Sequence, residues 1–118
     1  MAIYRNIQIS FYQDDFILSL TPEEKFFYLY LMTNSKTTQC GIYELPMRII
    51  EFETGFDLNK VKILLKKFID FRKVLYSDET KEIMLLNWMK HNPPANFNVQ
   101  KRIDKELKGV KNTQFIQI

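Results

Sequence analysis

The chain has 118 residues, of which 46% are hydrophobic and 14% aromatic, and a formal net charge of +3 at pH 7. This length and composition predict one globular domain and exclude a disordered chain. No apolar run approaches the roughly 20 residues of a membrane span, and no signal-peptide pattern is present at the N-terminus. We therefore expect a soluble, cytoplasmic protein with no membrane partner.

Charge distribution and cysteine usage narrow the function classes further. Residues 1–60 hold five Lys/Arg and eight Asp/Glu, a charge of −3, whereas residues 61–118 hold twelve and six, a charge of +6. A basic half is typical of a nucleic-acid-binding surface, and a solvated face is the alternative. Cys40 and His91 are the only Cys and His residues, which excludes an internal disulfide and a Cys/His zinc site. We expect Cys40 to be a small buried side chain.

The N-terminal segment predicts an arm that leads into a helix. Apolar residues alternate loosely from Ile3 to Phe11, which indicates an extended arm or a short strand. Asp14 and Asp15 are adjacent and point in different directions, so they do not resemble a pair of catalytic carboxylates. We interpret them as part of a turn or a short helix.

Residues 21–32 predict a helix without a polar face. Thr21 is an N-cap, Pro22 takes the first helical position, and Glu24 closes a capping box. A helix that is apolar on all sides must be covered on more than one side, which a domain this small rarely achieves alone. We therefore predict self-association through this helix, with folding-back of the arm as the alternative. The residues expected at the contact between copies are Phe26, Phe27, Tyr28, Tyr30 and Leu31.

The stretch 45–71 predicts two helices joined by a tight corner. Gly55 suits a left-handed residue at the end of the first helix, and Asp57 is a good N-cap for the second. The second helix is apolar on one side and lysine-rich on the other, which is typical of a helix-turn-helix. An ordinary helical hairpin with solvating lysines is the alternative. If this helix enters the major groove of DNA, the residues expected to contact DNA are Asn59, Lys60, Lys62, Ile63, Lys66 and Lys67.

Strands are predicted before and after this motif. A short strand at 41–44 precedes it, and β runs at 74–76 and 83–86, separated by a polar turn, predict a hairpin after it. The fold class predicted is mainly α with a small β-hairpin (α+β), a winged helix-turn-helix with an N-terminal arm and an extra C-terminal helix. Three carboxylates outnumber one lysine in the turn, so we expect this wing to repel phosphate. These residues are Asp78, Glu79, Lys81 and Glu82.

A proline-rich break at 92–96 ends the predicted winged-helix domain, residues 1–92. Residues 93–118 are expected to be a linker and a C-terminal helix that packs on the domain or extends from it. Asn98 is the expected N-cap of this helix. Two i,i+4 ion pairs are expected on its basic faces, Arg102–Glu106 and Asp104–Lys108. Its narrow apolar stripe consists of Val99, Ile103, Leu107 and Val110.

No arrangement of residues predicts catalysis. The three glycines, Gly41, Gly55 and Gly109, lie too far apart for a phosphate-binding loop. The sequence contains no P-loop, G-x-G-x-x-G or G-x-S-x-G motif. We therefore expect a protein that is not an enzyme, with no catalytic residues, no cofactor and no metal ion.

The assembled parts resemble the N-terminal domain of replisome-organiser proteins from phages of Gram-positive bacteria, which are relatives of the DnaD primosomal proteins. The matching stretches are FYQDDFILSLTPEEKFFYLYLMTNSKTTQCGIYELP, IIEFETGFD and KEIMLLNWMKHNPP. The match covers most of residues 3–110, and the first stretch is the most specific. Phe11-Tyr12 stands where relatives often have Phe-Trp.

The resemblance implies a phage- or prophage-encoded DNA replication initiation module in the cytoplasm of a bacterial host. Such a module self-associates, contacts double-stranded origin DNA, and works with a replicative helicase or its loader. Family members usually continue into a second helical domain, so we expect this chain to be an N-terminal fragment. Two alternatives remain: a protein–protein assembly module whose DNA binding lies in the missing domain, and a transcription regulator.

Overall fold

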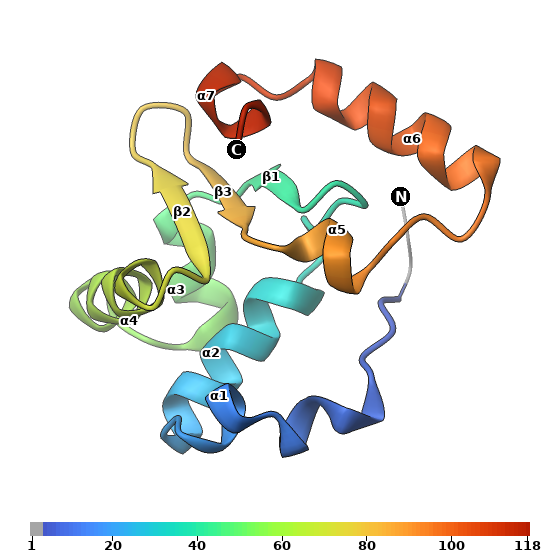
Figure 1. Cartoon of the computed structure of the whole chain (residues 1–118). Helices are drawn as coiled ribbons and strands as arrows, with labels where there is room; N and C mark the ends of the chain where they lie inside the picture. Colours follow the sequence, from blue (N-terminus) through green and yellow to red (C-terminus); the bar gives the residue numbers. More distant parts are fainter. Residues whose placement is uncertain (1–3) are drawn as a thin grey trace.

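The computed structural model describes residues 4–118, in which helices surround a small antiparallel sheet (Figure 1). The strands are β1 (Ile42–Glu44), β2 (Val74–Ser77) and β3 (Glu82–Leu85), in the order β1-β3-β2. The helical elements are η1 (Ile9–Gln13), α1 (Asp15–Leu18), α2 (Pro22–Thr33), α3 (Met47–Thr54), α4 (Leu58–Asp70), α5 (Trp88–His91), α6 (Phe97–Lys108) and α7 (Thr113–Ile116). The predicted α+β class and the predicted hairpin are confirmed.

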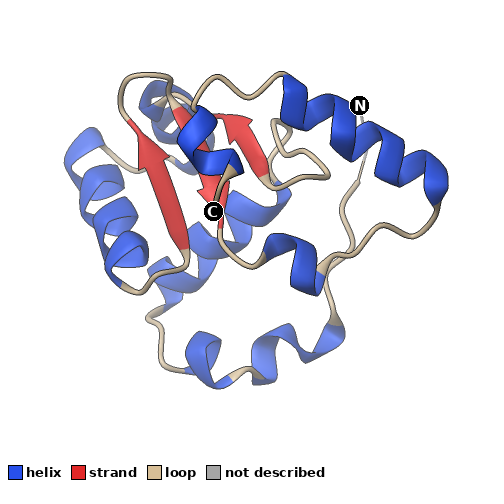
Figure 2. Ribbon diagram, turned by 45° about the horizontal axis from the view of Figure 1, so that its top comes forward, coloured by secondary structure: helices blue, strands red, loops and turns tan. Residues whose placement is uncertain are grey.

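The sheet separates two hydrophobic cores because successive side chains of a strand point to opposite faces. On one face, Tyr43, Val74 and Ile83 pack with α1 to α4 in the larger core. On the other face, Ile42 packs with α6 and α7 in a smaller core. Figure 2 shows the strands between these two groups of helices. The alternation of apolar side chains along each strand therefore determines which helices pack on each face of the sheet.

In the described part of the N-terminal arm, residues 4–13, the chain forms no strand. Ile3 lies outside the described residues, and the arm forms the 3-10 helix η1 from Ile9, so the predicted extended arm is wrong at this point. Asp14 caps α1 by accepting hydrogen bonds from the next backbone N–H groups. These two turns place the rings of Phe11 and Phe16 beside Tyr28, with centroids 6.5 and 5.8 Å away. The arm therefore folds back over α2.

This folding-back changes the interpretation of α2. The predicted capping box at its start is present, with Thr21 and Glu24 bonding each other's backbone N–H. Phe27 and Leu31 are fully buried in the chain's own core, and the Phe27 ring stacks on Phe68 at 6.1 Å. Their assignment to a contact between copies is therefore wrong, because α4 and the strands already cover them. The alternative, coverage by the arm, holds for Tyr28.

The corner between α3 and α4 forms as the sequence predicts. Gly55 ends α3 in the left-handed region with φ 81°, and its N–H donates to the Glu51 carbonyl at 2.9 Å. The Asp57 carboxylate accepts the N–H of Lys60 at 2.8 Å and begins α4. At the other end of α3, the buried Leu45 accepts a hydrogen bond from the Tyr76 hydroxyl at 2.9 Å. The hairpin and the two-helix motif are thereby joined.

Replacing Asp57 by Ala is expected to lower the free energy of unfolding by about 0.5–2 kcal/mol, because the N-cap hydrogen bond of α4 is lost. Urea denaturation followed by circular dichroism measures this change. Asp57→Asn keeps an acceptor at the same place and should cost only a fraction as much. Equal stability of Asp57→Ala and the unsubstituted chain would contradict the role of this cap.

The start and the charge pairing of α6 differ from the prediction. Asn96, not Asn98, is the N-cap, because its extended backbone lets Oδ1 accept the N–H of Val99 at 3.0 Å. The two predicted ion pairs are not formed within the described part of the chain. Glu106 instead accepts the backbone N–H of Cys40 at 3.0 Å, and Asp104 accepts from the Gln100 side chain at 3.0 Å. Cys40 is buried as predicted.

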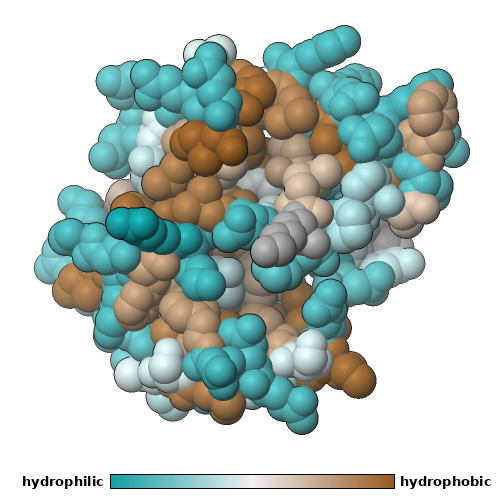
Figure 3. All heavy atoms as spheres, viewed as in Figure 1, coloured by the Kyte–Doolittle hydropathy of each residue, from teal (hydrophilic) through white to brown (hydrophobic). Residues whose placement is uncertain are grey.

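The end of the chain forms a second short helix, α7, where only a linker and one C-terminal helix were expected. The buried Glu82 carboxylate accepts the backbone N–H groups of Lys111 at 2.9 Å and Asn112 at 2.7 Å. Phe115 then packs into the smaller core with Ile103 of α6. An apolar area remains at the surface around α7 (Figure 3), where Ile116 is exposed.

Candidate nucleic-acid interface

Helix α4 presents a polar face to solvent because its apolar residues are spaced to one side. Its buried stripe consists of Val61, Leu64, Leu65 and Phe68. The opposite side carries Asn59, Lys62, Ile63 and Lys66, all exposed. The structure therefore brings together four of the six residues that the sequence predicts to contact DNA.

The other two predicted residues, Lys60 and Lys67, face carboxylates of α2. The Lys60 Nζ lies 3.1 Å from Glu23 Oε1, and the Lys67 ammonium forms an ion pair with Glu24. These partners lie more than 35 residues earlier in the sequence, in the first turn of α2. The expectation that Lys60 and Lys67 contact DNA is corrected, because both ammonium groups lie at α2 and not on the open face of α4. The partner of Lys67 is buried, whereas the pair of Lys60 is exposed on both sides and therefore weak.

The remaining lysines of α4 differ in whether a carboxylate of the chain already pairs with their positive charge. Lys66 pairs with Asp70 one turn later at 3.2 Å, but both side chains are exposed, so water and salt weaken this pair. Among residues 4–118, no carboxylate lies within ion-pairing distance of Lys62. Arg72, two residues after the end of the helix, is also exposed. Lys62 and Lys66 are the available cations of the face itself, and Arg72 is a third just beyond the helix.

Glu24 has an unusual environment for a carboxyl group. Burial alone would raise its pKa, but hydrogen bonds from the Lys67 ammonium and from the backbone of Thr21, together with the Lys67 charge, lower the pKa below the usual 4.5. The carboxylate therefore stays ionised and holds Lys67 against α2. This pair fixes α4 on α2 and sets the direction of the exposed face.

Two exposed apolar side chains accompany these charges. Ile63 is 62% exposed in the middle of the polar face of α4, and Phe52 of α3 is 89% exposed. An exposed isoleucine at such a position can contact a thymine methyl group in a major groove. A protein partner would bury the same two side chains. Contact with DNA and contact with a protein partner both require an exposed Ile63, as the structure has it.

The tip of the hairpin is less acidic than predicted. Glu82 is buried and accepts hydrogen bonds from the backbone before α7. It is therefore not one of the surface charges that repel phosphate at the hairpin tip. Asp78 and Glu79 remain exposed, beside the exposed Lys81. The assignment of Glu82 to a phosphate-repelling tip is therefore wrong, and the repulsion comes from two carboxylates.

A second basic surface lies on α6, the C-terminal helix that is the alternative location of the DNA contact. An open groove of about 760 Å³ lies between this helix and β1 with the start of α3. The groove depends on how α6 packs on the sheet, so no short-range sequence signal points to it. The basic residues that line it are Lys36, Arg102, Lys105 and Lys111.

No protein-family model, curated protein or solved structure matches this chain. Within residues 4–118, no helix is long and apolar enough to cross a membrane. The same part of the chain has no group of three or more His, Cys, Asp or Glu side chains arranged to hold a metal ion.

Proposed function

We propose that this chain is a winged-helix module of DNA replication initiation, of the phage replisome-organiser and DnaD-like type. The exposed face of α4, which follows a Gly corner and precedes a hairpin paired with β1, supports the winged-helix and DNA-contact part of the proposal. The role in replication initiation rests on the sequence resemblance over most of residues 3–110. In a winged helix, the helix at this position enters the major groove of DNA. Assembly with a second copy and with a replicative helicase or its loader belongs to the same proposal.

The proposed contacts divide into two kinds. Lys62, Lys66 and Arg72 bind phosphates, which position the protein without reading the sequence. Asn59 is suited to an adenine edge and Ile63 to a thymine methyl. The exposed Lys66–Asp70 pair opens at little cost, so Lys66 can exchange Asp70 for a phosphate. Lys60 and Lys67 lie toward α2 and not on the open face of α4, so they are not assigned to DNA.

Binding to double-stranded DNA is expected to be weak and salt-sensitive. With two or three phosphates neutralised, log K should fall against log salt with a slope of about −2 to −3. Fluorescence anisotropy with a labelled duplex measures this slope. The double variant Lys62→Glu/Lys66→Glu is expected to abolish the binding, because it reverses two of the three available cations.

A matched control separates this effect from the change in net charge. Lys25→Glu/Lys108→Glu makes the same charge change on α2 and α6 and should keep duplex binding within about threefold of the unsubstituted chain. Duplex binding by Lys62→Glu/Lys66→Glu at full strength would contradict the α4 contact. It would favour the second candidate, an assembly module.

The assembly module is supported by exposed apolar side chains on the arm. Ile9 of η1 is 98% exposed, and Leu18 of the neighbouring α1 and Tyr12 are also exposed. Single exposed hydrophobic residues are ordinary, but a group of them on adjacent elements is typical of an interaction surface. Self-association is therefore proposed through the arm and not through Phe27 or Leu31.

Sedimentation velocity of the unsubstituted chain is expected to show a dimer or larger assembly. Ile9→Asp/Leu18→Asp should shift it to monomer without lowering the melting temperature, because neither residue belongs to the larger core. Ser10→Asp/Gln13→Asp adds the same charges to exposed positions of the arm as a control. A monomeric unsubstituted chain at high concentration would contradict self-association.

A further inference from the structure

The groove beside α6 is open and lined by residues that lie far apart in the sequence. Lys36 comes from the loop after α2, and Arg102 and Lys105 come from α6. The rest of the lining comes from β1, the start of α3, β3 and the segment after α6. The apolar part of the lining includes Ile42 and Pro46. The volume of about 760 Å³ lies within the range of clefts that hold small ligands or single extended chains.

The carboxylates in this groove are engaged by the protein itself. Glu82 accepts two backbone N–H groups, Glu106 accepts that of Cys40, and Glu44 lies 3.4 Å from the Lys111 ammonium. By contrast, no carboxylate in residues 4–118 lies within ion-pairing distance of the three remaining cations of the lining. These cations, Lys36, Arg102 and Lys105, therefore favour an anionic ligand.

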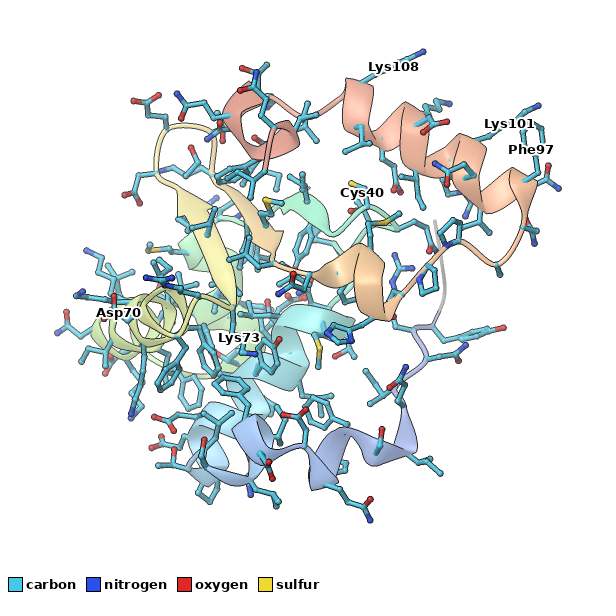
Figure 4. All side chains as sticks on the ribbon, in the orientation of Figure 1. Cys40, Asp70, Lys73, Phe97, Lys101 and Lys108 are labelled. Carbon is cyan, nitrogen blue, oxygen red and sulfur yellow. The ribbon has the colours of Figure 1, made fainter. Side chains whose placement is uncertain are left out.

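An exposed aromatic residue begins α6. Phe97 is 70% exposed and belongs to neither core. The Lys101 Nζ lies 4.8 Å from the centroid of its ring, and Figure 4 shows both side chains at the same end of α6. Lys108, at the opposite end, points outward and does not line the groove. An exposed ring with a cation over one face can stack an unpaired base on its other face.

We propose that α6 and this groove bind single-stranded nucleic acid. Lys36, Arg102 and Lys105 contact phosphates, and a base stacks on Phe97. Four cations and three carboxylates line the groove, a net charge of +1, and Phe97 lies outside the lining at the other end of the same helix. A basic surface that leads to an aromatic platform is the arrangement that single-strand binding uses. A duplex does not enter a concave site of this size, and an acidic peptide would not need the exposed ring.

This site is independent of the proposed duplex contact. Helices α4 and α6 pack on opposite faces of the sheet (Figure 2). The two surfaces share no residue, so variants of one leave the other intact. Failure of one proposal is therefore distinguishable from failure of the other.

The test is fluorescence anisotropy with a labelled thymidine oligonucleotide of about 16 nucleotides, within the site sizes of single-strand binders. Arg102→Glu/Lys105→Glu is expected to weaken binding at least tenfold, and Phe97→Ala about tenfold. Phe97→Tyr and Arg102→Lys/Lys105→Arg keep the chemistry and should bind like the unsubstituted chain. Circular dichroism checks that each exposed substitution leaves the fold intact.

The crossed measurements decide the assignment. Arg102→Glu/Lys105→Glu should bind the duplex normally, and Lys62→Glu/Lys66→Glu should bind the oligonucleotide normally. Equal oligonucleotide affinity of the unsubstituted chain and the α6 double variant would overturn the site. Displacement of the oligonucleotide by polyglutamate at the same concentration of charged residues would overturn the choice of nucleic acid in favour of an acidic peptide. An unchanged affinity of Phe97→Ala would overturn the stacking.

Discussion

Replacing Gly41 by Ala is expected to lower the free energy of unfolding by about 2–5 kcal/mol, the sum of a left-handed backbone and an overpacked contact. Gly41 has φ 81°, and a Cβ at this position would lie 2.6 Å from Cγ of Trp88. The indole has little freedom to move away, because its Nε1 donates to the Gln39 carbonyl at 2.9 Å. The added methyl must therefore displace α5 or β1.

Gly55→Ala is the matched control for this prediction. Gly55 has the same φ of 81° but nothing within 4 Å of an added Cβ, so only the backbone cost of about 1–2 kcal/mol applies. Urea denaturation of the two variants gives the difference directly. Equal losses of stability for Gly41→Ala and Gly55→Ala would contradict the steric conflict between a Cβ at position 41 and the Trp88 side chain.

Replacing Glu24 by Gln is expected to lower the free energy of unfolding by about 1–3 kcal/mol at pH 7, because the pair with Lys67 is lost. The lower half of this range is favoured, since the Lys67 side chain is 46% exposed. Glu23→Gln is the control, because its pair with Lys60 is exposed on both sides. Glu23→Gln should lower the free energy of unfolding by less than about 0.5 kcal/mol.

The contribution of Glu24 to the free energy of unfolding should decrease as the pH falls. Its pKa is lower in the folded chain than its usual 4.5, so the unfolded chain binds a proton more readily. The stabilisation by the Glu24 carboxylate is therefore complete above the usual pKa of 4.5. It is lost as the pH falls through the lower pKa of the folded chain. The gap in stability between the unsubstituted chain and Glu24→Gln should narrow from pH 7 to pH 3. A gap of equal size at both pH values would contradict the ion pair.

The parts of the fold that the sequence predicted correctly depend on contacts between near neighbours. The capping box of Thr21 and Glu24, the left-handed Gly55 and the cap at Asp57 each involve residues at most four apart. Strand alternation around Ile83 is equally local. These signals located the helix starts, the corner and the hairpin. The Asn96 cap was missed because Asn98 has the same side chain two residues later.

The errors concern contacts between residues distant in the sequence. Whether Phe27 faces a second copy or the chain's own core depends on the position of Phe68, 41 residues later. The pairing of Lys67 with Glu24 and of Glu82 with the backbone before α7 depends on packing in the same way. For the candidate interface, the sequence thus identified the α4 face but not which of its lysines are free.

The most direct test of the proposed α4 contact is to map the backbone amide chemical shifts of the isotope-labelled chain by NMR during a titration with duplex DNA. We expect the largest changes within residues 58–70, with Asn59, Lys62 and Ile63 among them, and only small changes in α6. Changes confined to residues 97–108, or an α4 that stays unchanged while the duplex binds, would contradict the contact through α4.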